Sequence, residues 1–255
     1  MPAPSAKPAT PGKSASYWLR TRAPRHSLTF ALPLLILYEA LAFLLSGDEL
    51  AGVRNGADVL LKSVFTAFGG RYGLTVFGVA LLGIGGILVF RDRKRGGPIE
   101  GRLFLPMVLE SVVYASLLGF VASRLTTLLL GGYRLAVGSS GMNEFGFPTQ
   151  IMISLGAGIY EELLFRVIVV SGIAWFARQL LGWKPAPCAV VATLLGATVF
   201  SAFHYVGPYG DPFEVSSFTF RAIAGVLFSA LYLTRGFGIA AWSHALYDVF
   251  LAVVR

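Results

Sequence analysis

The chain has 255 residues, of which 55% are hydrophobic and only 13% are charged, about half the charged fraction of a typical soluble domain. Its net charge of +8 comes without a nucleic-acid-binding pattern, and such an excess is common on the cytoplasmic loops of membrane proteins. This composition excludes a soluble globular domain and predicts an all-α, polytopic transmembrane helical bundle. The expected surroundings are a lipid bilayer, and nucleic acid is not an expected partner.

The N-terminal segment differs from the rest of the chain. Residues 1–26 are rich in Pro, Ala and Ser near the start and carry Arg20, Arg22 and Arg25 towards the end. A segment with so few large apolar residues cannot bury enough surface to offset the entropy of ordering it. We therefore predict a disordered, basic tail over residues 1–26 and a transmembrane domain over residues 27–255.

Apolar runs close to the roughly 20 residues needed to cross a bilayer as a helix recur along this domain. An amphipathic segment at 57–68 (ADVLLKSVFTAF) is too short and too charged to cross, so we predict an interfacial or re-entrant helix there. About seven spans are expected, at 28–46, 74–90, 103–130, 149–173, 187–206, 217–233 and 237–254.

Basic residues between the spans predict the orientation. Seven spans place the two chain ends on opposite sides, and most Lys and Arg residues fall on the side of the N-terminus. The Arg91–Arg95 cluster contributes most to this asymmetry. Since basic loops are retained on the cytoplasmic side, we predict a multi-pass integral membrane protein with its N-terminus in the cytoplasm.

Ionisable residues inside a predicted span are costly and usually mark a function or a packing pair. The span at 149–173 contains Glu161, Glu162 and Arg166. On a helix Glu162 and Arg166 are four residues apart and can form an ion pair, whereas Glu161 is rotated by about 100° from Glu162. One carboxylate is then neutralised while its neighbour is left free for chemistry, although a purely structural Glu–Arg pair is the plainer alternative.

Two histidines occupy later spans. His204 lies near the end of the span at 187–206, and His244 lies in the last span, four residues before Asp248. At this spacing the carboxylate of Asp248 can fix the tautomer and orientation of the His244 ring. Taken alone, His204 is better explained as an interfacial or packing residue, and His244 is equally well explained by a hydrogen bond between helices.

Together these residues suit the activation of water. A glutamate with two histidines supplies a general base and oxyanion stabilisers. The same trio, Glu161, His204 and His244, is also a ligand set for a divalent metal such as zinc, with an open fourth position. The sequence contains no His-Glu-x-x-His motif, and it leaves the choice between a metal cofactor and none open.

These residues resemble the signature of the CAAX prenyl protease and bacteriocin-processing (Abi) family of intramembrane proteases. The signature reads Glu-Glu-x-x-x-Arg, Phe-x-x-x-His and His-x-x-x-Asn or Asp on successive helices. It is matched here by Glu161-Glu162…Arg166, Phe200…His204 and His244…Asp248, within about 149–250. The resemblance implies a catalytic core over that region.

The resemblance also implies a role for each residue. Glu161 and His204 are expected to activate a water molecule, while His244 and Asp248 stabilise the tetrahedral intermediate. Glu162 and Arg166 are expected to support them. The implied substrate is a peptide or protein, lipidated or membrane-bound, and the expected activity is hydrolysis of a peptide bond.

Two departures from the signature keep other functions open. Val167 follows the motif arginine where many members have Gly, and Asp248 replaces the Asn of the eukaryotic prenyl proteases. The alternatives are a non-catalytic immunity or scaffold member of the family and a proton-coupled transporter. The roles of Glu39 and Glu110 are also left open: the alternatives are pairing with Arg124 or Arg221 and exposure to a cavity.

Overall fold

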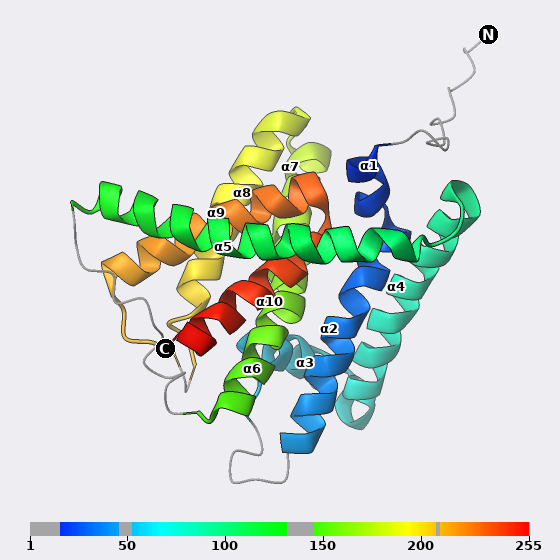
Figure 1. Ribbon diagram of the computed structural model, residues 1–255, viewed down its shortest axis with the longest axis horizontal. Coiled ribbons are helices and arrows are strands. Elements are labelled where there is room, and N and C mark those ends of the chain that lie inside the picture. The colour runs from blue at the N-terminus through cyan, green and yellow to red at the C-terminus, as the bar shows by residue number, and fades with distance from the viewer. Residues whose placement is uncertain (1–15, 46–52, 132–144, 208–209, 255) are drawn as a thin grey trace.

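The computed structural model describes residues 16–45, 53–131, 145–207 and 210–254. Over these residues the chain is helical and contains no strand, which confirms the predicted all-α bundle (Figure 1). Residues 1–15 of the predicted tail lie outside the described part of the chain.

The described residues of the first half of the chain, 16–45 and 53–131, form five α-helices. Pro24 begins α2 at a first-turn position, where its missing N–H has no helical partner to lose. The five helices are α1 (Tyr17–Arg22), α2 (Pro24–Leu44), α3 (Gly56–Gly69), α4 (Gly73–Gly96) and α5 (Phe104–Leu129). Short 3₁₀ turns at Gly70–Tyr72 and Gly101–Leu103 lead into α4 and α5.

In the second half, the part that the structure describes contains one long, composite helix and three further helices. The composite helix consists of α6 (Phe147–Gly156), the π-helical segment η5 (Ala157–Val170) and α7 (Ser171–Leu180). Its backbone stays helical at both junctions. The chain then forms α8 (Pro185–Phe203), α9 (Val215–Arg235) and α10 (Phe237–Val254).

Six helical stretches of the described chain are long and apolar enough to cross a membrane. They cover six of the expected spans, and one of them, Gly56–Gly96, also includes α3. The seventh expected span, 149–173, lies inside the composite helix, whose π-helical turns divide it into three shorter pieces. As expected, α3 is a separate short helix: its 14 residues extend about 21 Å, less than the hydrocarbon core.

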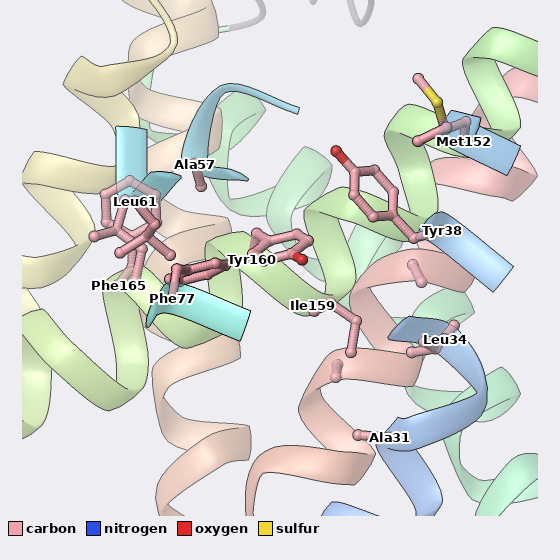
Figure 2. Packing of buried hydrophobic residues seen from close by; sticks show 14 of the residues in the cluster. Ala31, Leu34, Tyr38, Ala57, Leu61, Phe77, Met152, Ile159, Tyr160 and Phe165 are labelled. Atoms are coloured by element: carbon pink, nitrogen blue, oxygen red, sulfur yellow. The ribbon is translucent and has the colours of Figure 1, made fainter. Parts of the chain in front are cut away.

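The helix α10 lies at the centre of the bundle and packs against α2, α5, α6, η5 and α9. Around it, aromatic and aliphatic side chains form one core cluster that includes Tyr38, Phe77, Tyr160 and Phe165 (Figure 2). Large apolar side chains on α4 and α5 point outward instead. Such an apolar exterior is expected for helices that face lipid.

The prediction that disorder extends to residue 26 is wrong for residues 17–26, which form α1 and the start of α2. Polar anchors rather than apolar burial hold this segment. Arg25 binds Asp92 at 2.9 Å, Nε2 of His26 accepts a hydrogen bond from the backbone N–H of Glu100 at 3.0 Å, and Arg20 pairs with the Glu100 carboxylate. Hydrogen bonding to Arg20 holds the pKa of Glu100 below its usual value, with a further contribution from Arg102.

The two glutamates with no assigned role are both paired. Glu110 on α5 binds Nη2 of Arg235 at 2.8 Å and accepts a hydrogen bond from Tyr17, so it joins α5 to the end of α9 and to α1. Glu39 on α2 binds Lys62 at 3.0 Å. Their partners are therefore neither Arg124 nor Arg221, the residues considered from the sequence.

Candidate active site

The composite helix, α8 and α10 bring together all of the predicted site residues. Glu161, Glu162 and Arg166 lie on η5, His204 caps the C-terminal end of α8, and His244 and Asp248 lie on α10. Glu161, Glu162, Arg166 and His244 are buried, while the side chain of His204 keeps 25% of its exposure. The site is thus buried on the η5 side and more open at the end of α8.

One oxygen of Glu161 faces both histidines. The Oε2 atom of Glu161 lies 3.9 Å from Nε2 of His204 and 3.9 Å from Nε2 of His244. It is buried, and it has no hydrogen-bond partner among the described residues. A gap of this size is too long for a direct hydrogen bond and calls for a bridging water, because a buried carboxylate oxygen left without a partner is costly.

In each histidine a hydrogen bond at Nδ1 fixes the orientation of the ring, and so the direction in which Nε2 points. Nδ1 of His204 lies 2.9 Å from the backbone oxygen of Phe200, and Nδ1 of His244 lies 2.8 Å from Oε1 of Glu162. Both partners only accept, so each Nδ1 carries the proton. In a neutral ring Nε2 is then a free acceptor that points towards Glu161.

Glu162 is neutralised as its spacing predicted. Its Oε2 atom lies 3.3 Å from Nε of Arg166, and both side chains are almost fully buried. The Arg166 guanidinium also lies over the rings of Phe200 and Phe228, at 4.4 and 5.6 Å from their centroids. Aromatic faces attract a buried guanidinium, so Arg166 is held beside Glu162 by both charge and packing.

The residue that orients His244 differs from the one expected. The spacing favoured Asp248, but its Oδ2 atom lies 3.7 Å from Nε2 of His244, beyond hydrogen-bond range. The orienting bond comes from Glu162, on a different helix. The ring is also stacked on Phe228, with centroids 4.4 Å apart. Asp248 therefore lies beside Nε2, the ring nitrogen that faces Glu161, and not beside Nδ1.

The close approach of η5 to α10 depends on Gly158. A Cβ atom at this position would meet the backbone oxygen of Ala241 and lie 2.6 Å from the Cβ of Ala245. Only a glycine lets the two helix backbones come this near, which is how small residues act at membrane helix interfaces. This contact brings Glu162 within reach of His244. The π-helical turns of η5 carry all three charged residues, and such turns are frequent at functional sites.

The side-chain atoms of Glu161, His204 and His244 are of the types that bind a divalent metal, but they lie further apart than metal ligands do. Two imidazole nitrogens and a carboxylate oxygen form a zinc-type set, and bonds of about 2.1 Å place tetrahedral donors about 3.4 Å apart. The 3.9 Å separations here are wider. Within the described ranges, the structure contains no group of three or more His, Cys, Asp or Glu residues arranged to hold a metal. At these separations the three donor atoms lie too far apart to share one tetrahedral metal ion.

Sequence reasoning missed one residue that contacts the site. Asn55, at the start of α3, donates a hydrogen bond from Nδ2 to Oε1 of Glu161 at 2.8 Å. An Asn before the amphipathic segment is a recognisable helix cap. Nothing in the sequence connects it with a glutamate 106 residues further on.

The fold and the site define the class: a polytopic helical membrane protein with a buried centre of one glutamate and two histidines. Residues 143–250 match the family model described as type II CAAX prenyl endopeptidase Rce1-like. This region is thus a domain of the CAAX prenyl protease and bacteriocin-processing family, as the three motifs predicted. The match supports a membrane-embedded protease as the general class. No curated protein and no solved structure shows significant similarity to the chain.

Proposed function

We propose that this protein is an intramembrane endopeptidase in which Glu161 and His204 hold and activate a water molecule. The observation that carries the proposal is the Oε2 atom of Glu161, buried without a partner and equidistant, at 3.9 Å, from two histidine nitrogens. A structural Glu–Arg pair accounts for Glu162 and Arg166. It does not account for a second buried carboxylate, which would only add desolvation cost.

In the proposed reaction Glu161 acts first as a base and then as an acid. The water lies between Oε2 of Glu161 and Nε2 of His204, and its oxygen attacks the carbonyl carbon of the scissile bond. Its proton passes to Glu161. When the carbon–nitrogen bond breaks, the same proton passes to the leaving amine, so that one group serves both steps.

His244 is proposed to stabilise the oxyanion that forms on the attacked carbonyl. For this role Nε2 of His244 must carry a proton, which makes the ring positively charged because Nδ1 is already a donor to Glu162. Glu162 on one side and Asp248 on the other, at 2.8 and 3.7 Å, favour such a charge. Asp248 then acts through His244, because an ionised aspartate has no proton to donate to an oxyanion.

We propose a glutamate-dependent reaction without a metal cofactor, since the spacing of the donors is wider than a tetrahedral site requires. Incubation with EDTA or 1,10-phenanthroline is expected to leave the cleavage rate unchanged. A loss of activity that added Zn²⁺ restores would contradict this part of the proposal.

The proposed substrate is a peptide or protein that reaches the site from the bilayer. The description of the matched family favours a prenylated C-terminal peptide as the first probe. An internally quenched peptide with a farnesylated cysteine, compared with the same peptide without the lipid, tests whether the lipid is required.

The decisive variant is Glu161→Gln, which keeps the shape of the side chain and removes the base. In proteoliposomes it is expected to abolish cleavage while thermal stability stays near that of the wild type. Glu214→Gln, at an exposed glutamate before α9, makes the same chemical change as a control and should stay active. A fully active Glu161→Gln variant would refute the proposal.

The same proteoliposomes separate the two rival functions. A non-catalytic family member would cleave neither peptide, and its cellular phenotype would survive Glu161→Gln. A transporter would show a substrate-linked proton flux that Glu161→Gln abolishes.

A further inference from the structure

We infer that Asn55 is a positioning residue for Glu161: it holds one carboxylate oxygen so that the other faces the two histidines. This inference rests on the proposed function. Asn55 lies in the N-terminal third of the chain, outside the matched residues 143–250. Asn55 is buried, with only 3% of the residue exposed.

The amide of Asn55 makes two different hydrogen bonds. Its Oδ1 atom accepts from the backbone N–H of Ala57 at 2.9 Å, which caps the N-terminus of α3. Its Nδ2 atom donates to Oε1 of Glu161 at 2.8 Å. An N–H needs an acceptor and a carboxylate needs a donor, so the amide can be oriented only this way round. Capping and positioning are therefore performed by separate atoms.

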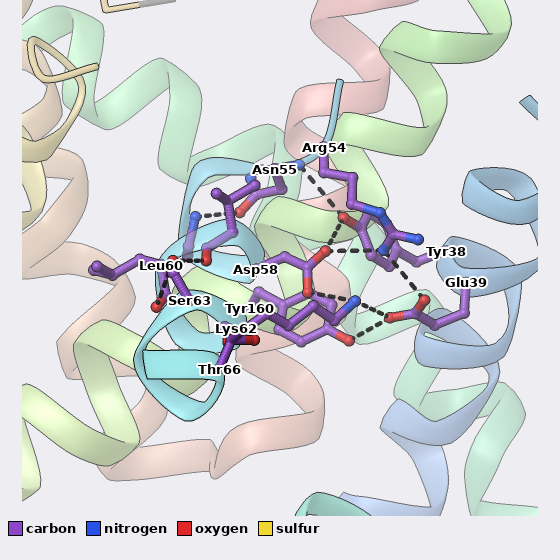
Figure 3. A network of polar contacts seen from close by, with 12 residues as sticks. Tyr38, Glu39, Arg54, Asn55, Asp58, Leu60, Lys62, Ser63, Thr66 and Tyr160 are labelled. Carbon is purple, nitrogen blue, oxygen red and sulfur yellow. Dashed lines mark hydrogen bonds and ion pairs between the residues drawn. The ribbon is translucent and has the colours of Figure 1, made fainter. Parts of the chain in front are cut away.

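A charge network holds the start of α3 in place against α2 and η5 (Figure 3). At its centre the buried carboxylate of Asp58 pairs with Arg54 at 3.0 Å and Lys62 at 2.8 Å, and it accepts a hydrogen bond from Tyr38 at 2.7 Å. Glu39 joins the network through Lys62 and through Tyr160, which donates to it at 2.6 Å. Asp58 is fully buried, whereas Arg54, Lys62 and Glu39 keep part of their side-chain surface exposed, and the two acids and two bases balance in charge.

The network ends next to the proposed base. Tyr160 precedes Glu161 in the chain, and the hydroxyl of Tyr38 accepts a long hydrogen bond, 3.4 Å, from the backbone N–H of Asn55. Packing also leaves Asn55 little room. A Cβ atom on Gly156 would lie 2.7 Å from the Cβ of Asn55 and 2.6 Å from the ring of Tyr38. Asn55 is thus enclosed by α2, α3 and the composite helix.

A fixed Oε1 has a direct chemical consequence. A carboxylate that can rotate offers either oxygen to water, whereas Asn55 restricts Glu161 to the orientation in which Oε2 lies 3.9 Å from both histidines. Preorganisation of this kind acts on the chemical step. Loss of the donor should therefore lower kcat and leave KM nearly unchanged.

The test uses variants that keep the cap and remove the donor. Serine is a good helix cap but is too short to reach Glu161, so Asn55→Ser should keep the cap of α3 and lose only the stability that the hydrogen bond to Glu161 contributes. Its kcat on the quenched peptide is expected to fall about 10- to 100-fold, because a misplacement of about 1 Å in a reacting geometry can cost about 100-fold. Ser63→Ala, an exposed change on the same helix, is the control and should keep the wild-type kcat.

Asn55→Asp adds a second measurement, the pH dependence of kcat, which should not change if Asn55 has only a structural role. Aspartate also caps α3, but an ionised carboxylate repels Glu161, so at neutral pH this variant should lose more kcat than Asn55→Ser. A protonated carboxyl group can donate a hydrogen bond. The kcat of Asn55→Asp relative to the wild type should therefore rise as the pH falls, while the relative kcat of Asn55→Ser stays level.

The outcomes separate this inference from the proposed function. If Asn55→Ser keeps the wild-type kcat while Glu161→Gln is inactive, the positioning role is wrong and the proposed base stands. If Glu161→Gln is itself fully active, the proposed function fails. A fall in stability with unchanged kcat would reduce Asn55 to a helix cap and overturn the inference.

Discussion

Glu162 has two partners within the site, Nδ1 of His244 at 2.8 Å and Nε of Arg166 at 3.3 Å. The first contact sets the direction of a ring, and the second balances the charge of the carboxylate. Phe200 contacts both histidines: its backbone oxygen holds His204, and its ring lies 4.9 Å from the ring of His204 and 6.0 Å from that of His244. These contacts give a physical reason for the Glu-Glu-x-x-x-Arg and Phe-x-x-x-His spacings.

Arg166→Ala should be one of the most damaging single changes in the chain. It leaves Glu162 charged and buried, and breaking a buried ion pair in this way typically costs about 3–5 kcal/mol. The free energy of unfolding, measured by SDS titration in bicelles, should fall by about that amount. Arg178→Ala removes an exposed arginine from α7 and should change stability little. Equal stability of the two variants would contradict the role given to Arg166.

At the scale of elements, the site depends on how η5 lies against α10. Neither helix carries the whole centre, because Glu161 and Glu162 come from η5 and His244 comes from α10. Their backbones approach closely at Gly158, opposite Ala241 and Ala245. A change in this packing should therefore affect stability and catalysis together.

Gly158→Ala tests this contact. The added Cβ has no space between the helices, and overpacking of this kind costs about 1–3 kcal/mol. We expect a lower free energy of unfolding and a lower kcat, because Glu162 moves away from His244. The matched control is Gly172→Ala on α7, where an added Cβ meets nothing within 4 Å and alanine favours the helix. A Gly158→Ala variant with wild-type kcat and stability would show that the close approach is not required.

At the scale of the whole molecule, the N-inside orientation remains a prediction from the basic residues. It places the Arg91–Arg95 end of α4 in the cytoplasm. If the composite helix crosses the bilayer, it also places the segment between α8 and α9 on the opposite side. His204 and the start of α9 would then lie towards that outer face.

Single cysteines can test this orientation in a Cys188→Ala background. Lys94→Cys and Glu214→Cys alter exposed side chains at the two ends. With a membrane-impermeant maleimide on intact spheroplasts, Glu214→Cys should be labelled at once and Lys94→Cys only after permeabilisation. The reverse pattern would invert the predicted orientation.

The sequence predicted the helical elements well because apolar runs and their polar boundaries are local features. The last span was expected at 237–254 and is found at Phe237–Val254, and α3 was recognised from its amphipathic pattern. The three motifs likewise identified the residues that converge at the site. Long-range contacts could not be predicted in the same way: the hydrogen bond from Asn55 to Glu161 spans 106 residues.

Other features of the site depend on geometry that the sequence does not encode locally. An α-helical spacing favoured Asp248 as the partner of His244, but Glu162 on η5 makes the hydrogen bond to the ring instead. The order in residues 17–26 comes from ion pairs and hydrogen bonds to the last turns of α4 and to the segment after it. A composition-based argument counts only the apolar surface that a segment can bury, so it missed these anchors.

The central claim is that Glu161 and His204 act on the same water molecule. The most direct test is a double-mutant cycle of kcat for cleavage, with residual product measured by mass spectrometry after long incubation. Groups that act as one unit are strongly non-additive, so Glu161→Gln combined with His204→Ala should be no slower than the slower single variant. If the two losses multiply instead, the residues act independently, and the shared water is contradicted.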